Sequence, residues 1–219
     1  MTEYTILRAR RKTVAIHITR EGNIEVRAPY AAPRAQIDRF VQEKAGWIAQ
    51  KQAEMRRRIA LRPARGFLPG QTLPLFGKEY PVEDTGAAHA SFDGVRFQMP
   101  RGLATEGRAA EVERLYRALA RSRVQEAVTR YAPLVGVRPR GVRISGAKTR
   151  WGSCSAKGWL NFSYRLMFAP EAAVDYVVVH ELTHLVEHNH SSRFWTAVER
   201  VLPDRKAREA LLRACDNEL

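Results

Sequence analysis

Apolar and polar residues alternate over the first thirty residues of the chain, and this alternation predicts short strands. Val14, Ile16 and Ile18 are separated by single small or polar residues, which is the two-residue period of a strand with one buried face. A Glu-Gly-Asn sequence then supplies a turn into the next apolar segment. The expected strands cover residues 4–10, 13–20 and 24–28.

A helical period follows the strands. Pro33 can open a helix, because the donor that proline lacks would have no partner at the first helical position. Ile37, Val41 and Ile48 then fall on one side of a helix expected to run to about residue 59. Turn residues separate two predicted hairpins farther along the chain. The hairpins pair residues 73–76 with 79–82, and residues 91–92 with 95–97.

Beyond Pro100 the predicted elements are mainly helices. A long helix is expected over residues 106–131, with Pro133 beyond its end. A strand at 142–144 and a partner strand at 159–166 follow, and further helices are expected from residue 169 onward. The pattern predicts an α+β fold, with a β-rich N-terminal region over residues 1–100 and a helical region with a small antiparallel sheet over residues 101–219.

The motif His-Glu-Leu-Thr-His at residues 180–184 is the strongest chemical signal. His180 and His184 would lie one turn apart on the same side of a helix, so both imidazoles can reach one metal ion. Neutral imidazole is a preferred ligand of zinc. Glu181 can then take a proton from water at the metal. Three consecutive valines before the motif favour a strand by propensity alone, but the motif requires a helix and predicts that these valines are buried.

A catalytic zinc ion usually keeps three protein ligands, so a third ligand is expected. On a continuing helix His188 would lie about 12 Å along the axis from His180, too far to share an ion. His190 can converge if the helix stops and the chain folds back, and Asn189 tolerates the left-handed conformation that ends helices. We therefore predict Zn²⁺ as the cofactor, with His180, His184 and His190 as ligands.

Other ligand sets stay open. A third histidine ten residues after the first is also the metzincin spacing, but that pattern requires glycine where this chain has Glu187 and a methionine turn downstream. Met167 is the last methionine, so a metzincin is rejected. Glu199 is an alternative third ligand, in a set of two histidines and a glutamate. Cys154 is a possible fourth ligand, although a buried thiol is the simpler reading.

Several segments around the motif resemble the YgjP-like metallopeptidase family, which is related to the SprT-like zinc proteases. They are residues 10–14, 22–29, 47–48, 148–154, 159–162, 175–184, 189–191 and 194–195. The resemblance thus covers nearly the whole chain. It implies a zinc-dependent peptidase with a zincin-like C-terminal domain, with His180, His184 and His190 as ligands and Glu181 as catalytic base.

The composition is strongly basic. The formal net charge is +14 and the isoelectric point about 10.4, which favours contact with nucleic acid or another polyanion, or else a solvated basic surface. We find no N-terminal hydrophobic run and no apolar stretch of the roughly 18 residues that a membrane span needs. Cys154 and Cys215 lie far apart, which suggests a reducing compartment. A cytoplasmic protein without membrane contact is expected.

These observations predict a zinc metallopeptidase, a hydrolase that cleaves a peptide or protein substrate. An extended substrate is expected to pair with residues 159–162, while Arg150 or Trp151 lines the cleft. The alternatives are a basic nucleic-acid-binding protein with a structural zinc, a protease that acts near DNA, and an amidase with a non-protein substrate. Only in the first alternative is Glu181 dispensable.

Overall fold

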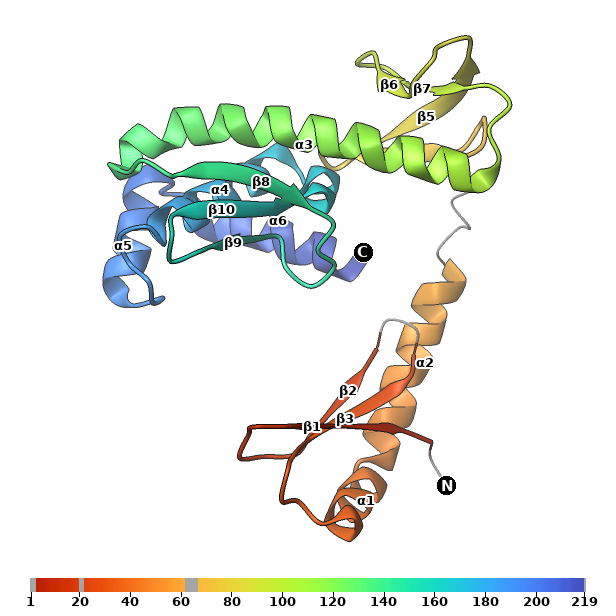
Figure 1. Cartoon of the computed structure of the whole chain (residues 1–219), viewed down its shortest axis with the longest axis vertical. Coiled ribbons are helices and arrows are strands. Elements are labelled where there is room, and N and C mark those ends of the chain that lie inside the picture. The colour runs from red at the N-terminus through yellow and green to blue at the C-terminus, as the bar shows by residue number, and fades with distance from the viewer. Residues whose placement is uncertain (1–2, 20–21, 62–66, 219) are drawn as a thin grey trace. The chain divides into compact units, whose positions relative to one another are not determined.

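The computed structural model describes residues 3–19, 22–61 and 67–218, and it shows an α+β protein (Figure 1). The chain divides into two compact units, Met1–Arg65 and Gly66–Leu219. The division predicted near residue 100 therefore differs from the one that the contacts show. Among the described helices, none combines the length and the apolar composition needed to cross a membrane.

The first unit is a three-stranded sheet packed against helices. Its elements are β1 (Thr5–Ala9), β2 (Ala15–Ile18), β3 (Ile24–Pro29), α1 (Arg34–Glu43) and α2 (Ala45–Leu61). The central strand β3 is parallel to β1 and antiparallel to β2. Val26 of β3, Ile37 and Ile48 are fully buried in one core, as the apolar periods predict. The predicted single helix is two helices, because the backbone leaves the helical conformation at Lys44.

The second unit begins with a four-stranded sheet in the order β4-β5-β7-β6. Its strands are β4 (Thr72–Leu75), β5 (Lys78–Thr85), β6 (Ser91–Phe92) and β7 (Phe97–Pro100). Both hairpins are confirmed, with antiparallel β4–β5 and β6–β7 pairs. The sheet packs on the long helix α3 (Thr105–Val135), where Tyr116 Oη donates a hydrogen bond of 2.6 Å to the Pro74 carbonyl. This contact explains why residues 66–100 belong with the C-terminal unit.

Helix α3 is longer than the sequence predicts. Pro133 lies inside its last turn, and the helix ends at Gly136, which adopts the left-handed conformation at φ 82°. A proline interrupts a helix by removing one hydrogen bond, but here the chain continues for two more helical residues before the glycine. In Figure 1, α3 runs alongside both sheets of the second unit.

A second sheet lies beside the helix α4 (Glu171–Thr183). Its strands are β8 (Gly141–Ser145), β9 (Gly152–Cys154) and β10 (Trp159–Ser163), in the order β8-β10-β9. The sheet is mixed, because β10 is parallel to β8 and antiparallel to β9. The strand predicted over residues 159–166 ends at Ser163, and the chain continues as a 3₁₀ turn, η1 (Tyr164–Phe168). The remaining helices are α4 (Glu171–Thr183), α5 (Ser192–Val201) and α6 (Arg205–Glu218).

Candidate metal centre

Helix α4 forms despite its three valines because it is packed on almost every side. Val177, Val178 and Val179 are at most 4% exposed. Tertiary burial of this kind outweighs the small cost of β-branched residues in a helix. Pro170 precedes the helix and Glu171 lies in its first turn, where a carboxylate is favourable next to the helix dipole. The helix predicted from the motif is thus confirmed.

The reversal after the motif begins earlier than predicted. Helix α4 ends at Thr183 and His184 is its C-cap, so the helix does not continue to Asn189. The turn is held by the Glu187 N–H, which donates to the Thr183 carbonyl at 2.9 Å. Ser191 then caps α5 by accepting a hydrogen bond from the Phe194 N–H at 3.4 Å. The result is that the chain returns toward α4 at residue 190.

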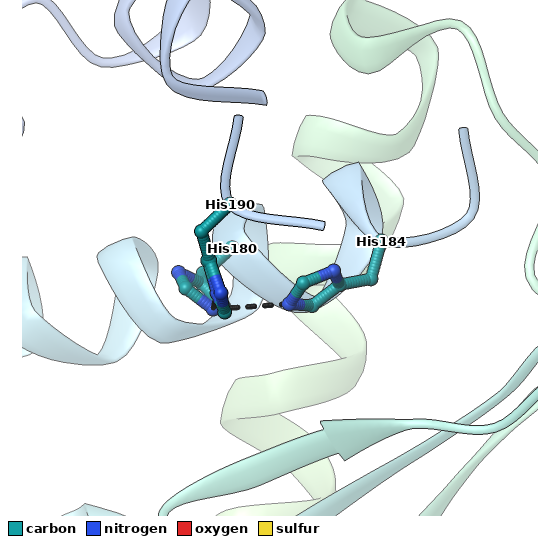
Figure 2. Close-up of side chains that lie close together, drawn as sticks. All are labelled: His180, His184 and His190. Carbon is teal, nitrogen blue, oxygen red and sulfur yellow. Dashed lines mark hydrogen bonds between the residues drawn. The ribbon is translucent and has the colours of Figure 1, made fainter. Parts of the chain in front are cut away.

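Three imidazole rings meet at this reversal, as Figure 2 shows for His180, His184 and His190. The Nε2 atom of His180 lies 3.2 Å from Nε2 of His184 and 3.0 Å from Nε2 of His190. A tetrahedral zinc ion with Zn–N distances of 2.0–2.1 Å separates its ligand atoms by about 3.3 Å. The spacing of the nitrogens therefore fits one such ion.

The hydrogen bond of His184 leaves its Nε2 lone pair available. Its Nδ1–H donates to the backbone carbonyl of Glu187 at 3.1 Å, so in the neutral ring Nε2 carries no proton. This contact comes from the main chain of Glu187, not from its carboxylate. The Nδ1 atom of His180 is buried and has no hydrogen-bond partner among the described residues.

Burial favours the neutral form of His180 and His184. It is the main reason that the pKa of His180 falls to about 3, and the nearby His184 and His190 act in the same direction because their positive charge would repel a second one. Burial also lowers the pKa of His184. A neutral imidazole is the form that binds a metal ion, so the environment favours ligation over protonation.

The aromatic ring of Phe194 supports all three imidazoles, a role that sequence analysis missed. It is fully buried, and its centroid lies 4.9 Å from His180, 4.7 Å from His184 and 4.7 Å from His190. The next residue, Trp195, stacks on His190 with ring centroids 5.5 Å apart. The available signal was the spacing of Phe194 and Val198, which marks the buried face of α5.

The Glu181 side chain is buried next to β9. It is 6% exposed, and burial raises the pKa of its carboxyl group to about 7, while Arg150 and the Cys154 N–H act in the opposite direction. A group with a pKa near neutrality can both accept and return a proton. Trp151, one of the two residues predicted to line the cleft, is half-buried and packs against the main core.

The other candidate ligands lie outside the cluster. Of the described residues, only the three histidines form a group with all its ligand atoms within 4.8 Å. Glu199 forms an ion pair with Arg205 at 2.8 Å on the surface. The Cys154 thiol donates a weak hydrogen bond to the Ser155 carbonyl at 3.6 Å, and burial raises its pKa.

Comparison with known proteins places the chain in a family. The model of the YgjP-like metallopeptidase domain matches residues 12–214, so the chain belongs to the YgjP-like metallopeptidase family. The search of curated proteins found no match. Among solved structures the chain is similar to the metallopeptidase zymogen abylysin of Pyrococcus abyssi, with 28% identity over 42% of this chain and 92% of that chain and a TM-score of 0.39.

Proposed function

We propose that this protein is a zinc-dependent peptidase in which His180, His184 and His190 hold the ion and Glu181 is the catalytic base. The observation that carries the proposal is the convergence of three Nε2 atoms. The Nε2 atom of His180 lies 3.2 Å from that of His184 and 3.0 Å from that of His190. The substrate is a peptide or protein. The proposed compartment is the cytoplasm, in keeping with two cysteines that form no disulfide bond.

A zinc ion bound there would supply a Lewis acid that makes a water molecule more acidic and polarises the scissile carbonyl. Glu181 accepts the proton of the attacking water, since its pKa of about 7 matches that task near neutral pH. The same carboxyl group then returns the proton to the leaving amine. Glu181 is buried, so bulk water has little access to its carboxyl group.

The free edge of β9 is the proposed alignment site for the substrate. The strand first expected to bind substrate, β10, is the centre of its sheet and is hydrogen-bonded on both sides, so it has no edge to offer. Strand β9 is an edge strand, and its residue Gly152 touches Glu181. An extended peptide added along β9 would receive main-chain hydrogen bonds whatever its side chains are.

The substitution Glu181→Gln tests the mechanism, because it removes the base but keeps the size of the side chain. We expect unchanged zinc content and a fall in kcat of about 10²–10⁴-fold, the usual contribution of general base catalysis. Zinc is measured by elemental analysis, and cleavage by mass spectrometry on a peptide library. A fully active Glu181→Gln variant would exclude the mechanism and favour a structural zinc.

A further inference from the structure

The outer face of the second sheet is cationic. Side chains alternate between the two faces of a strand, and Leu160 and Phe162 of β10 are fully buried on the core side. Asn161 therefore points to the opposite, outer face. Its register partner on β8 is Arg143, which projects from the same face. This face is outside the histidine cluster and has no part in the proposed hydrolysis.

Two hollows are each lined in part by residues of β8. The first has a volume of about 550 Å³ and is lined by Arg140, Arg143, Ser155, Lys157, Trp159 and Asn161, together with Ala156. The second has a volume of about 460 Å³ and is lined by Arg117, Arg121, Ser122 and Ile144, together with Ala118. Arg143 and Ile144 are consecutive residues of β8 and project from opposite faces of the strand, so the two hollows lie on different faces of the sheet. Only the first hollow lies on the outer face, and no carboxylate lines it.

The first hollow contains a planar platform. A Cβ atom at Gly141 would lie 2.6 Å from the Trp159 ring, so the indole lies flat against the backbone of β8. The Arg143 guanidinium stacks above this ring at 4.1 Å from its centroid, and Arg140 lies 5.8 Å from it. Stacking fixes the plane of the guanidinium but leaves its N–H edges able to donate.

The cations of the first hollow are not neutralised within the protein. Elsewhere in this unit many arginines form ion pairs, such as Arg114 with Glu111 at 3.0 Å. In the part of the chain that the structure describes, no carboxylate lies within 4 Å of Arg140, Arg143 or Lys157. Their charge is therefore available to an anion from outside, which would release bound counterions when it binds.

We propose that the first hollow forms a binding surface for single-stranded nucleic acid. Phosphodiester groups would pair with Arg140, Arg143 and Lys157. An unstacked base fits against the Arg143–Trp159 platform, because flat cation–aromatic surfaces bind the faces of bases. An acidic peptide would use the cations but not the platform. The net charge of +14 adds long-range attraction for a polyanion.

The test measures binding of labelled single strands of about 12 nucleotides, dT and U, by fluorescence anisotropy over a range of salt concentrations. The variant Arg140→Ser/Arg143→Ser/Lys157→Ser removes three charges from the first hollow. The matched control Arg101→Ser/Arg200→Ser/Lys206→Ser removes three exposed charges that line neither hollow. Both variants have the same net charge, so any difference reports the surface itself.

We expect the hollow variant to lose at least about tenfold in affinity and about 2 in the slope of log K against log salt, since each lost phosphate contact contributes about 0.7. The control is expected to stay within about threefold of the unmodified protein. Equal losses in both variants would overturn the proposal, because binding would then reflect net charge alone.

The variant Arg143→Lys tests the platform, because it keeps the charge but removes the planar stack. We expect weaker binding of the single strand without a change in the salt slope. Polyglutamate and a duplex of the same length serve as competitors. Competition by polyglutamate as strong as by the single strand would assign the surface to an acidic protein instead, and equal competition by the duplex would exclude single-strand selectivity. The protein needs neither metal nor peptidase activity for these measurements.

Discussion

Gly152 of β9 lies directly against the carboxyl group of Glu181. A Cβ atom at position 152 would come within 2.8 Å of both Cγ and Oε1 of Glu181. Real Cβ contacts are not that short, so the edge strand can approach the helix only because residue 152 has no side chain. The same approach brings the Cys154 N–H to the carboxylate. The strand proposed to align the substrate therefore also positions the proposed base.

Substituting Gly152→Ala is expected to displace the Glu181 carboxyl group and lower kcat by about 10²-fold, since a shift of about 1 Å in a catalytic group has an effect of this size. Bound zinc is expected to stay unchanged, because the atoms nearest to an added Cβ belong to Glu181 and not to the histidines. Ser153→Ala in the same strand is the control and should keep its activity. Steady-state kinetics with metal analysis checks both, and full activity of Gly152→Ala would refute this role of the glycine.

His190 and Glu199 make opposite predictions for zinc binding. Because only His190 converges with the other two histidines, His190→Ala is expected to lower zinc affinity strongly, while Glu199→Ala keeps it. Competition against a chromogenic chelator measures both affinities. Loss of zinc in the Glu199 variant alone would establish the alternative ligand set.

Phe194→Leu is expected to weaken zinc binding by about 10–100-fold, the range seen when a group that supports metal ligands is changed. Its ring contacts all three imidazoles, so a smaller side chain lets them tilt apart. Phe97→Leu is the matched control, because Phe97 is equally buried but contacts Tyr80, Phe92 and Tyr116 instead. If both variants lost stability alike and kept zinc alike, Phe194 would be an ordinary core residue.

The buried ion pair of Asp175 with Arg123, at 2.5 Å, joins α4 to α3, and Tyr131 Oη donates to the same carboxylate at 2.9 Å. Asp175→Asn leaves the buried Arg123 charge with only the exposed carboxylate of Glu171, 3.6 Å away, and is expected to cost about 3–5 kcal/mol of unfolding free energy. The exposed pair of Glu126 with Arg130 provides the control, because Glu126→Gln should cost less than about 1 kcal/mol. Urea unfolding followed by circular dichroism compares the two variants, and equal costs would contradict the buried role.

Glu111 gives the protein an acid-sensitive contact. Hydrogen bonds from Arg114 and from the Ala90 N–H hold the pKa of Glu111 at about 2, below its ordinary value of 4.5. A carboxyl group with a lowered pKa stabilises the fold above pH 4.5, and this contribution is lost as the pH falls toward 2. The unfolding free energy should therefore fall less steeply with acid in Glu111→Gln than in the unmodified protein, by about 1 kcal/mol over that range because solvent screens the pair. Parallel curves for the two proteins would contradict this assignment.

The sequence was sufficient to predict those elements that depend only on a local hydrophobic period or on a turn sequence. The hairpins of β4–β5 and β6–β7 were predicted because each combines short apolar segments with a turn sequence. The break at Lys44 and the helical position of Pro133 were missed, because a backbone bend or its absence depends on packing that no short window contains. The central position of β10 was also missed, since strand order is a long-range property.

The amino-acid sequence by itself determined that His180 and His184 share one side of a helix, because helical periodicity is local. It also identified His190 and the family, through a spacing and a set of matching segments. Only the tertiary structure decided that the chain reverses directly after His184, that Phe194 supports the rings, and that Gly152 touches Glu181. These contacts join residues from separate elements, and burial of the elements against one another sets their geometry.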